Sequence, residues 1–444
     1  MKTQHCHPPV RRGQSPRMNA TTRGMKALDQ GDWETAELSF SEALGRNPRD
    51  VEANFGMARL ALAAGFPEDV PNFTRLPGIS DPRLADAEYS ALRLLGKPEE
   101  AVSHALAFLA TTPDAAAFRQ RLGNDLLAEH RYAEAVPVFR EGAKRDPSDH
   151  KMAGGEAMAC MSLGRMDETR AAIQRRLKLL PNDPLVHSHW FALHSGVPTI
   201  TAADLLALGL QWDDRFGNNP DAFQHPSLPD TTGRKPRIGF LSSTFHHHAN
   251  CQFLLPLLES LDRSRFELFA YHDGPGADDV TALCEKATDH FRKLHGMPEK
   301  KAASIINGDG IDLLIDINAH YDNARPRILT YRPAPVQVHY LGGTTTTGLR
   351  SVDWRIADDL NEPLDQDESK IGTERIHRIA GGIHSYRPLR ATAEPDSLPA
   401  LRNGHLTLGC LNSLTKMEDD VLRLWGRCLQ AIPDARHRLV KQWF

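Results

Sequence analysis

A loop of small polar residues follows a short apolar segment in the second half of the chain. Val336–Leu341 has the β-branched and aromatic side chains of a buried strand, and the prolines of Arg332–Pro335 stiffen its start because proline fixes φ. Gly342–Gly348 then supplies backbone N–H groups and four threonine hydroxyls that can approach a ligand closely. This pattern suits an anionic or sugar ligand, although an ordinary strand-to-turn corner has the same composition.

Three consecutive histidines, His246–His248, follow another apolar segment, Arg237–Ser242. Adjacent side chains point in different directions, so the three rings are poorly placed to share one metal ion. A single histidine of this loop could act as a general base or contact a sugar, because imidazole changes its protonation near neutral pH. A solvated surface histidine is the competing interpretation.

The segments that carry these loops alternate between strand and helix patterns. The predicted strands and the helices between them are, in chain order, 237–242, 253–261, 266–271, 280–287, 300–306 and 311–317. Such alternation is typical of a parallel sheet with helices on both faces, where ligands bind beyond the carboxyl ends of the strands. The loops expected to converge there are 242–252, 318–325 and 342–348. No GxGxxG follows the first strand, which argues against ordinary dinucleotide binding.

The first half of the chain repeats with a period near 34 residues. One series of turn residues recurs at spacings of 34, 31, 34 and 34, and a series of prolines recurs at the same spacings. A glycine lets the chain turn between two helices and a proline ends the second helix, so each unit is a helix–turn–helix repeat. The residues are Gly31, Gly65, Gly96, His130 and Gly164, then Pro48, Pro82, Pro113, Pro147 and Pro181.

Segments such as Gly31–Ala36 and His130–Ala135 resemble the tetratricopeptide pattern. Five such units predict a superhelix with a concave face suited to extended peptides. The second unit should be distorted, because Pro67 and Pro71 stand where its second helix would run.

Composition narrows the class of protein. The chain has 444 residues, of which 40% are hydrophobic and 25% charged, and its net charge of −4 argues against a nucleic-acid binder. No apolar run is long enough to span a bilayer, so no membrane attachment is expected. The six cysteines lack a CxxC pair, which favours reduced thiols in a cytoplasm over disulfides or a zinc site. We interpret the acidic loop Asp365–Asp367 as solvated and predict no metal site.

We divide the chain into five parts. The polar segment Gly217–Lys235, rich in proline and glycine, marks the main boundary. Beyond residue 400 a strand, a helix and a further strand begin a second sheet, which we expect to be incomplete. The parts are a disordered lead-in at 1–18, helical repeats at 19–184, a helical linker at 185–234, a Rossmann-like lobe at 235–400 and the start of a second lobe at 401–444.

Four segments that follow the repeats in the chain resemble the O-GlcNAc transferase and SPINDLY family of glycosyltransferases: RIGFLSSTF, DGIDLLIDINAHYDNAR, RPAPVQVHYLG and GCLNSLTK. The resemblance covers nearly the whole chain from Thr21, and RPAPVQ is its most specific piece. It implies an α plus α/β chain, in which a tetratricopeptide superhelix precedes a Rossmann-like GT-B lobe and the second, nucleotide-sugar-binding lobe is truncated. It also implies inverting transfer, without a metal or another cofactor, of a sugar such as N-acetylglucosamine from UDP to serine or threonine hydroxyls.

The resemblance assigns roles to particular residues. His248 matches the family's active-site histidine, and Lys416 matches a lysine that stabilises the UDP leaving group. A fixed ammonium would offset the charge that develops on the departing diphosphate. A lysine at a helix start without an anionic ligand is poorly placed, because the helix dipole is positive there. The implied substrate-binding residues are His320, Gly342, Thr346, Thr347 and Asn412.

Other positions depart from the family pattern. Thr244 and Gln252 stand where relatives have an aspartate and a second histidine, and Ser304 and Asn307 replace two proposed catalytic groups of the animal enzymes. These losses leave a second interpretation open, a non-catalytic tetratricopeptide interaction protein with a degenerate transferase lobe. A transferase acting on a small molecule or a glycan is a third. We expect a protein or peptide partner on the repeats, and self-association is left open.

Residues 19–184 should fold on their own into a cooperative, strongly helical domain, because each repeat buries its apolar face on the next. Circular dichroism of this fragment should show a helical spectrum and a sigmoidal thermal transition. The spectrum of a disordered chain would contradict the assignment of repeats.

Overall fold

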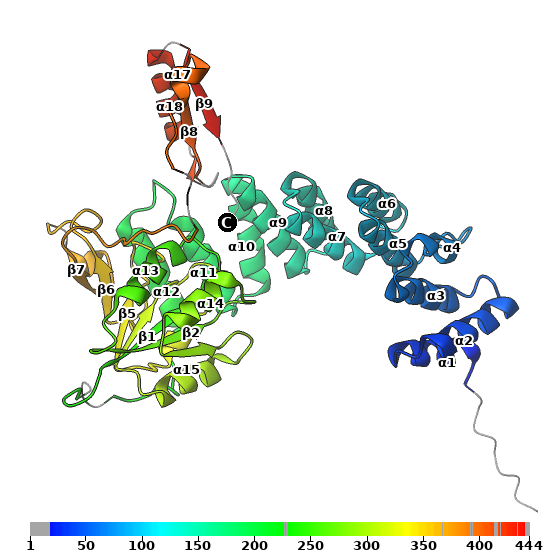
Figure 1. The fold of residues 1–444 in the computed structure, drawn as a ribbon, viewed down its shortest axis with the longest axis horizontal. Helices are drawn as coiled ribbons and strands as arrows, with labels where there is room; N and C mark the ends of the chain where they lie inside the picture. Colours follow the sequence, from blue (N-terminus) through cyan, green and yellow to red (C-terminus); the bar gives the residue numbers. More distant parts are fainter. Residues whose placement is uncertain are drawn as a thin grey trace, which may run out of the picture. The chain divides into compact units, whose positions relative to one another are not determined.

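The structure is a computed structural model that describes residues 18–439 apart from 226, 228, 229, 366, 391, 393, 413–415, 418 and 433. The chain divides into two compact units between Gly155 and Glu156. Figure 1 shows helices in the first unit, and both strands and helices in the second. This arrangement confirms the predicted fold class, in which helical repeats precede an α/β domain.

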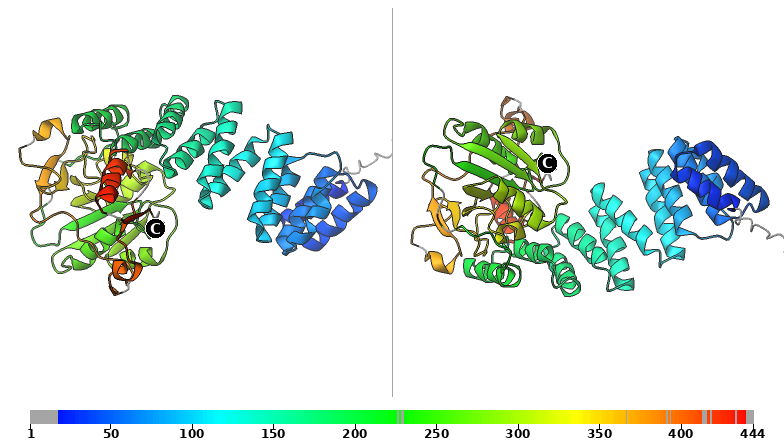
Figure 2. Two further views of the ribbon diagram at one scale, coloured as in Figure 1. Left: turned by 90° about the horizontal axis from the view of Figure 1, so that it is seen from above. Right: turned by 90° about the horizontal axis from the view of Figure 1, so that it is seen from below.

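Paired helices make up the first unit, as the repeat pattern predicts, and Figure 2 shows their succession from two further directions. The turns inside the first, third and fourth repeats contain Gly31, Gly96 and His130, each with a positive φ. In the second repeat, a 3-10 turn at Pro67–Asp69 and a short helix replace the second long helix, because two prolines interrupt it. The helices are α1 (Ala20–Asp29), α2 (Trp33–Arg46), α3 (Val51–Ala64), α4 (Pro71–Thr74), α5 (Pro82–Leu94), α6 (Pro98–Thr111), α7 (Ala116–Ala128), α8 (Tyr132–Arg145) and α9 (His150–Ser162), which crosses the boundary between the units.

A phenylalanine packed against glycines recurs in the repeats. Phe40 of α2 is fully buried, and a Cβ atom on Gly24 or Gly56 would lie 2.6 or 2.3 Å from its ring. Phe139 occupies the same place in α8, where a Cβ atom on Gly123 would lie 2.5 Å from its ring. The small residue of one helix therefore makes room for the large residue of another, and this size complementarity sets the spacing within a repeat.

The second unit contains a parallel sheet of seven strands in the order β3-β2-β1-β4-β5-β6-β7. The chain reverses direction across the sheet between the neighbouring strands β1 and β4, which creates the crevice where such folds bind ligands. The strands are β1 (Arg237–Ser242), β2 (Glu267–His272), β3 (His290–Lys293), β4 (Leu313–Asp316), β5 (Val336–His339), β6 (Trp354–Ala357) and β7 (Arg375–Arg378). The helices are α10 (Met166–Leu179), α11 (Pro184–His194), α12 (Ala202–Phe216), α13 (Cys251–Ser260), α14 (Asp279–Lys286), α15 (Glu299–Gly308) and α16 (Arg327–Thr330).

Neighbouring residues of β1 face opposite sides of the sheet, and each side has its own apolar core. Phe240 packs in one core with residues of α13 and α14, while Leu241 packs in the other with residues of α15 and α16. Trp212 of α12 belongs to this second core, and its indole N–H donates to the Pro184 carbonyl at 2.9 Å. The linker helices are thus part of the α/β domain's core. No helix within the described residues has the length and apolar character needed to cross a membrane.

The last part of the second unit is a small segment with a two-stranded parallel sheet. Its elements are α17 (Pro399–Asn403), β8 (Thr407–Cys410), α18 (Asp419–Ala431) and β9 (Arg436–Leu439). Among the described residues from 397 to 438, none has a buried side chain. A sheet of two strands without a buried core is marginally stable, because it removes little apolar surface from water.

Backbone amides of β8 and β9 should therefore exchange with solvent about a hundred-fold faster than those of β1 and β4. Hydrogen–deuterium exchange of the full chain, read by mass spectrometry on proteolytic peptides, measures both in one sample. Equal protection of the two sheets would contradict the expected marginal stability of the C-terminal sheet.

Candidate functional site

The side chain of Asn318 ties the loops after β1 and β4 together at the crevice. It is fully buried, and its Oδ1 accepts hydrogen bonds from the Ser242 hydroxyl at 2.8 Å and the Ser243 N–H at 3.0 Å. Its Nδ2 donates to Asp322 at 3.1 Å and to the Thr244 hydroxyl at 3.3 Å. Because all of its polar atoms are used internally, Asn318 positions the loop backbones and leaves no atom for a ligand.

His248 lies at the surface of this crevice, close to a carboxylate. Its Nε2 is 3.6 Å from Asp322 Oδ1, and the two side chains are 29% and 34% exposed. Its Nδ1 accepts a hydrogen bond from the Asn250 N–H at 3.2 Å, so in the neutral ring the proton is on Nε2 and faces Asp322. Thr244 stands where relatives have an aspartate, and in this chain Asp322 of another loop places a carboxylate near His248. In this orientation His248 is a hydrogen-bond donor, and a role as base requires the ring to turn.

Asp322 and its neighbour Asn323 have an unusual backbone conformation, with φ values of 55° and 56°. Asn323 accepts a hydrogen bond from His189 of α11 at 3.0 Å if the imidazole carries its proton there. Left-handed backbone is tolerated by Asp and Asn better than by other residues with side chains, and it often occurs at functional sites. Asp322 was not predicted from the sequence, although its position in one of the three converging loops was a signal.

The other histidines of the loop do not assemble a metal site. The rings of His246 and His248 are 5.8 Å apart, and those of His246 and His272 are 6.5 Å apart. Burial lowers the pKa of His246, which favours its neutral form. Within the described ranges, no group of three or more His, Cys, Asp or Glu side chains is arranged to hold a metal ion.

The threonine loop is held by a buried glutamate. The Thr346 hydroxyl donates to Glu374 at 2.6 Å, and Thr347 donates to the same carboxylate through its hydroxyl and, at 2.7 Å, through its N–H. Both threonine side chains are buried, so these hydroxyls are not available to a ligand. Glu374 uses the side-chain donors of Thr346 and Thr347 in this conformation, and the assignment of both residues to substrate binding stays a prediction.

Gly342 and Arg355 support the same loop. A Cβ atom on Gly342 would lie 2.0 Å from the Ile317 carbonyl oxygen, so only glycine permits this approach of two backbones. Packing thus requires glycine at position 342, and the assignment of Gly342 to substrate binding stays a prediction. The Arg355 guanidinium, also buried, donates to the Thr344 carbonyl at 2.9 Å and pairs with Glu362. The sequence analysis did not single out Arg355 or Glu362, because arginine and glutamate are usually surface residues.

His320 is fully buried between the linker helices and the threonine loop. Its Nδ1 lies 2.9 Å from the Ser188 hydroxyl and its Nε2 lies 2.9 Å from the Thr347 carbonyl oxygen. A carbonyl can only accept, so Nε2 carries the proton and Nδ1 accepts from Ser188. Phe191 and Trp212 cover the ring, at centroid distances of 4.4 and 5.3 Å. In this structure the side chain has neither a free nitrogen nor an exposed face, and the assignment of His320 to substrate binding stays a prediction.

The two remaining predicted residues lie in the C-terminal segment. Lys416 and Asn412 have exposed side chains, and residues 413–415 between them lie outside the described residues. Their roles toward a nucleotide-sugar donor stay predictions.

Both parts of the chain are similar to known proteins. Residues 174–376 match the family Glycosyl transferase family 41, and residues 21–69 and 126–188 each match a tetratricopeptide repeat family. A probable UDP-N-acetylglucosamine--peptide N-acetylglucosaminyltransferase SPINDLY of Arabidopsis thaliana is 32% identical over 220 residues, which are 49% of this chain and 23% of that protein. The SPINDLY protein of Oryza sativa subsp. japonica is 30% identical over 51% of this chain and 25% of its own length.

The chain spans about a quarter of the length of these curated relatives. Among solved structures, a mutant of the Thermobaculum terrenum O-GlcNAc transferase matches 95% of this chain and 67% of its own, with a TM-score of 0.61 and 22% identity. At that identity the likeness supports a shared fold.

The stability of the second unit should fall in mild acid because of His320. Burial lowers the pKa of this imidazole from 6.5 to about 4. Its contribution to stability is therefore complete above pH 6.5 and is lost as the pH falls toward 4, since the unfolded state binds the proton more tightly. Between pH 7.5 and 5.0 we expect this group to cost about 2 kcal/mol of unfolding free energy.

Urea unfolding of the full chain at both pH values measures this change, with the His320→Gln variant as the reference that lacks the titrating group. The variant should be less stable at pH 7.5 and should lose less stability on acidification. Identical pH dependence in the two proteins would contradict the buried neutral imidazole.

Proposed function

We propose that the chain is a glycosyltransferase of the O-GlcNAc transferase and SPINDLY type, and that it glycosylates serine or threonine hydroxyls of proteins held by its repeats. The donor proposed is UDP-N-acetylglucosamine or a closely related nucleotide sugar. The observation that carries this proposal is the extent of the family 41 match, whose residues 174–376 include β1, β4, β5 and the complete crevice between them.

The proposed reaction is a single displacement at the anomeric carbon. The acceptor hydroxyl oxygen bonds to that carbon on one face while the bond to the diphosphate oxygen breaks on the other, so the configuration inverts. The bonding electrons leave with UDP, and the hydroxyl proton passes to His248, whose ring first turns to present its unprotonated nitrogen to the acceptor. We assign to Lys416 the compensation of charge on the leaving diphosphate, and this requires neither a metal nor another cofactor.

The chain is proposed to act in the cytoplasm. The described cysteines Cys160, Cys251, Cys284, Cys410 and Cys428 are all free thiols. Reduced thiols of this kind are usual where glutathione and thioredoxin keep cysteines reduced.

A non-catalytic interaction protein is the second candidate. Ser304 and Asn307 donate their side-chain hydrogen bonds to the backbone carbonyls of Lys300 and Pro333, so they serve the local structure. The C-terminal segment, which should meet the donor, has no buried side chain among its described residues. Both observations are consistent with weak donor binding, and we expect a UDP-N-acetylglucosamine affinity no better than millimolar, about 4 kcal/mol.

Transfer of radiolabelled N-acetylglucosamine from UDP to a serine- and threonine-containing peptide library tests the two candidates. Lys416→Ala should lower turnover by roughly two to three orders of magnitude, the scale for losing one fixed charge at a leaving group. Lys416→Arg should restore little, because a planar guanidinium does not replace a compact ammonium. His248→Ala should lower turnover less than Lys416→Ala does.

Lys301→Ala, which removes an exposed lysine of α15, is the matched control and should keep full activity. EDTA should leave transfer unchanged. Full activity of Lys416→Ala would refute the assignment of this lysine. A chain that neither transfers sugar nor binds the donor would support the interaction protein.

A further inference from the structure

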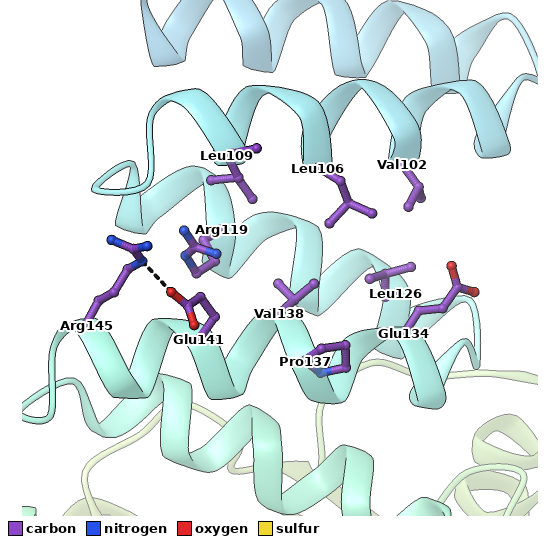
Figure 3. Close-up of a pocket in the computed structure, with 11 residues that line it drawn as sticks. Val102, Leu106, Leu109, Arg119, Leu126, Glu134, Pro137, Val138, Glu141 and Arg145 are labelled. Atoms are coloured by element: carbon purple, nitrogen blue, oxygen red, sulfur yellow. Dashed lines mark ion pairs between the residues drawn. The ribbon is translucent and has the colours of Figure 1, made fainter.

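An apolar groove of about 400 Å³ runs between helices α6 and α8 of the first unit, over part of α7 (Figure 3). Both α6 and α8 are the second helices of their repeats. Its apolar lining comes from Val102, Leu106, Leu109, Leu126 and Val138. Leu106 is 47% exposed, so the groove is open to ligands along α6.

Charged side chains mark the two ends of this α6–α8 groove. Figure 3 shows Arg119, Arg145 and Glu141 together at one end and Glu134 at the other. Glu134 already pairs with Arg131 at 2.7 Å, outside the apolar lining. Arg145 pairs with Glu141 at 2.8 Å and lies 3.7 Å from Asp114. The carboxylates at the basic end are therefore engaged by Arg145.

Arg119 differs from these residues because it is buried and lacks an acidic partner. Only 5% of its surface is exposed, and its hydrogen bond within the described chain joins Nη2 to the Pro113 carbonyl at 2.8 Å. It forms no ion pair with a described residue. Burial, with a further effect of the nearby Arg145 charge, lowers the pKa of Arg119, and the charges of Glu141 and Asp114 oppose this shift. A buried guanidinium without a carboxylate is costly, and buried arginines are normally paired.

We propose that the α6–α8 groove binds a peptide that inserts an aliphatic side chain among Leu106, Leu126 and Val138 and places a carboxylate against Arg119. The apolar lining selects the aliphatic side chain, and the unpaired buried cation selects the carboxylate. A free C-terminus and an Asp or Glu side chain offer the same chemistry. The second helices of repeats three and four, together with α7, thus form a binding surface for short acidic–aliphatic peptides.

This inference names the kind of partner that the repeats hold, and to that extent it rests on the proposed function. The binding itself requires no donor sugar. A chain that binds such peptides but transfers nothing would therefore refute the transferase proposal and leave the α6–α8 groove intact.

Fluorescence polarisation of the full chain with a labelled hexapeptide library tests the groove. Each pool fixes one position as Leu, Asp, Asn or Lys, and each is made with a free and with an amidated C-terminus. We expect the pools that fix Leu and the pools that fix Asp to bind at least ten-fold more tightly than the pools that fix Asn or Lys at the same position. If the carboxylate is the C-terminal one, the free pools will bind and the amidated pools will not.

Arg119→Met removes the charge and keeps the length of the side chain. It should weaken the Asp pools at least ten-fold and abolish their advantage over the Asn pools, while the melting temperature stays the same or rises. The control is Arg121→Met on the same helix, where the arginine pairs with Asp86 at 2.5 Å outside the groove. This variant should bind all pools as the unmodified chain does.

A second variant keeps the test decisive if Arg119→Met does not fold. Leu106→Glu puts a negative charge at an exposed position of the groove and should weaken the Asp pools at least ten-fold. Leu94→Glu makes the same change at a leucine that is 66% exposed and does not line the groove. The proposal would be overturned if Asp and Asn pools bound equally and free and amidated pools also bound equally, if the selectivity of Arg119→Met were unchanged, or if the two leucine variants had equal effects.

Discussion

One buried imidazole joins segments of the second unit that are distant in sequence. His320 accepts from Ser188 of α11, donates to the Thr347 carbonyl and packs against Phe191 and Trp212. A neutral imidazole offers one donor and one acceptor on opposite sides, which is what this position requires. The linker helices, the end of β4 and the threonine loop therefore depend on the same ring. The linker forms one wall of the α/β domain.

The polar loops at the crevice are satisfied mainly by one another. Asn318 bonds the loops after β1 and β4, and Glu374 accepts from three donors of the threonine loop. Buried polar groups need such partners, and a fixed network also holds a binding site in one geometry. Few polar side chains of these loops are therefore left to contact a ligand. Among the described residues of the crevice, His248 and Asp322 are partly exposed. Their side chains lie next to each other, one as a hydrogen-bond donor and the other as an acceptor.

The repeats share one kind of packing, and among their described residues Arg119 is a buried charge without an acidic partner. Phe40 and Phe139 fill the spaces that Gly24 and Gly123 leave, so these contacts explain the stacking of helices without reference to a ligand. Arg119 contacts the Pro113 carbonyl as Asn54 and His187 contact the prolines six residues before them, but its charge has no acidic partner among the described residues, and burying that charge opposes folding. The repeats thus combine a regular scaffold with a local chemical feature on the side formed by their second helices. In the proposed function, recognition of a protein partner and sugar transfer are separate tasks of the two units.

The amino-acid sequence by itself determined the repeat period, the distorted second repeat and the strands β1, β2, β4 and β5, because these depend on local patterns of glycine, proline and apolar residues. It did not reveal β3, β6 or β7, whose short segments, such as His290–Lys293, carry charged side chains and become strands by pairing with neighbours. Only the tertiary structure decided which polar residues of the loops remain for a ligand. Thr347 meets Glu374 across 27 residues, and His320 meets Ser188 across 132. A local pattern cannot show such partners, since they are brought together by the packing of the whole domain.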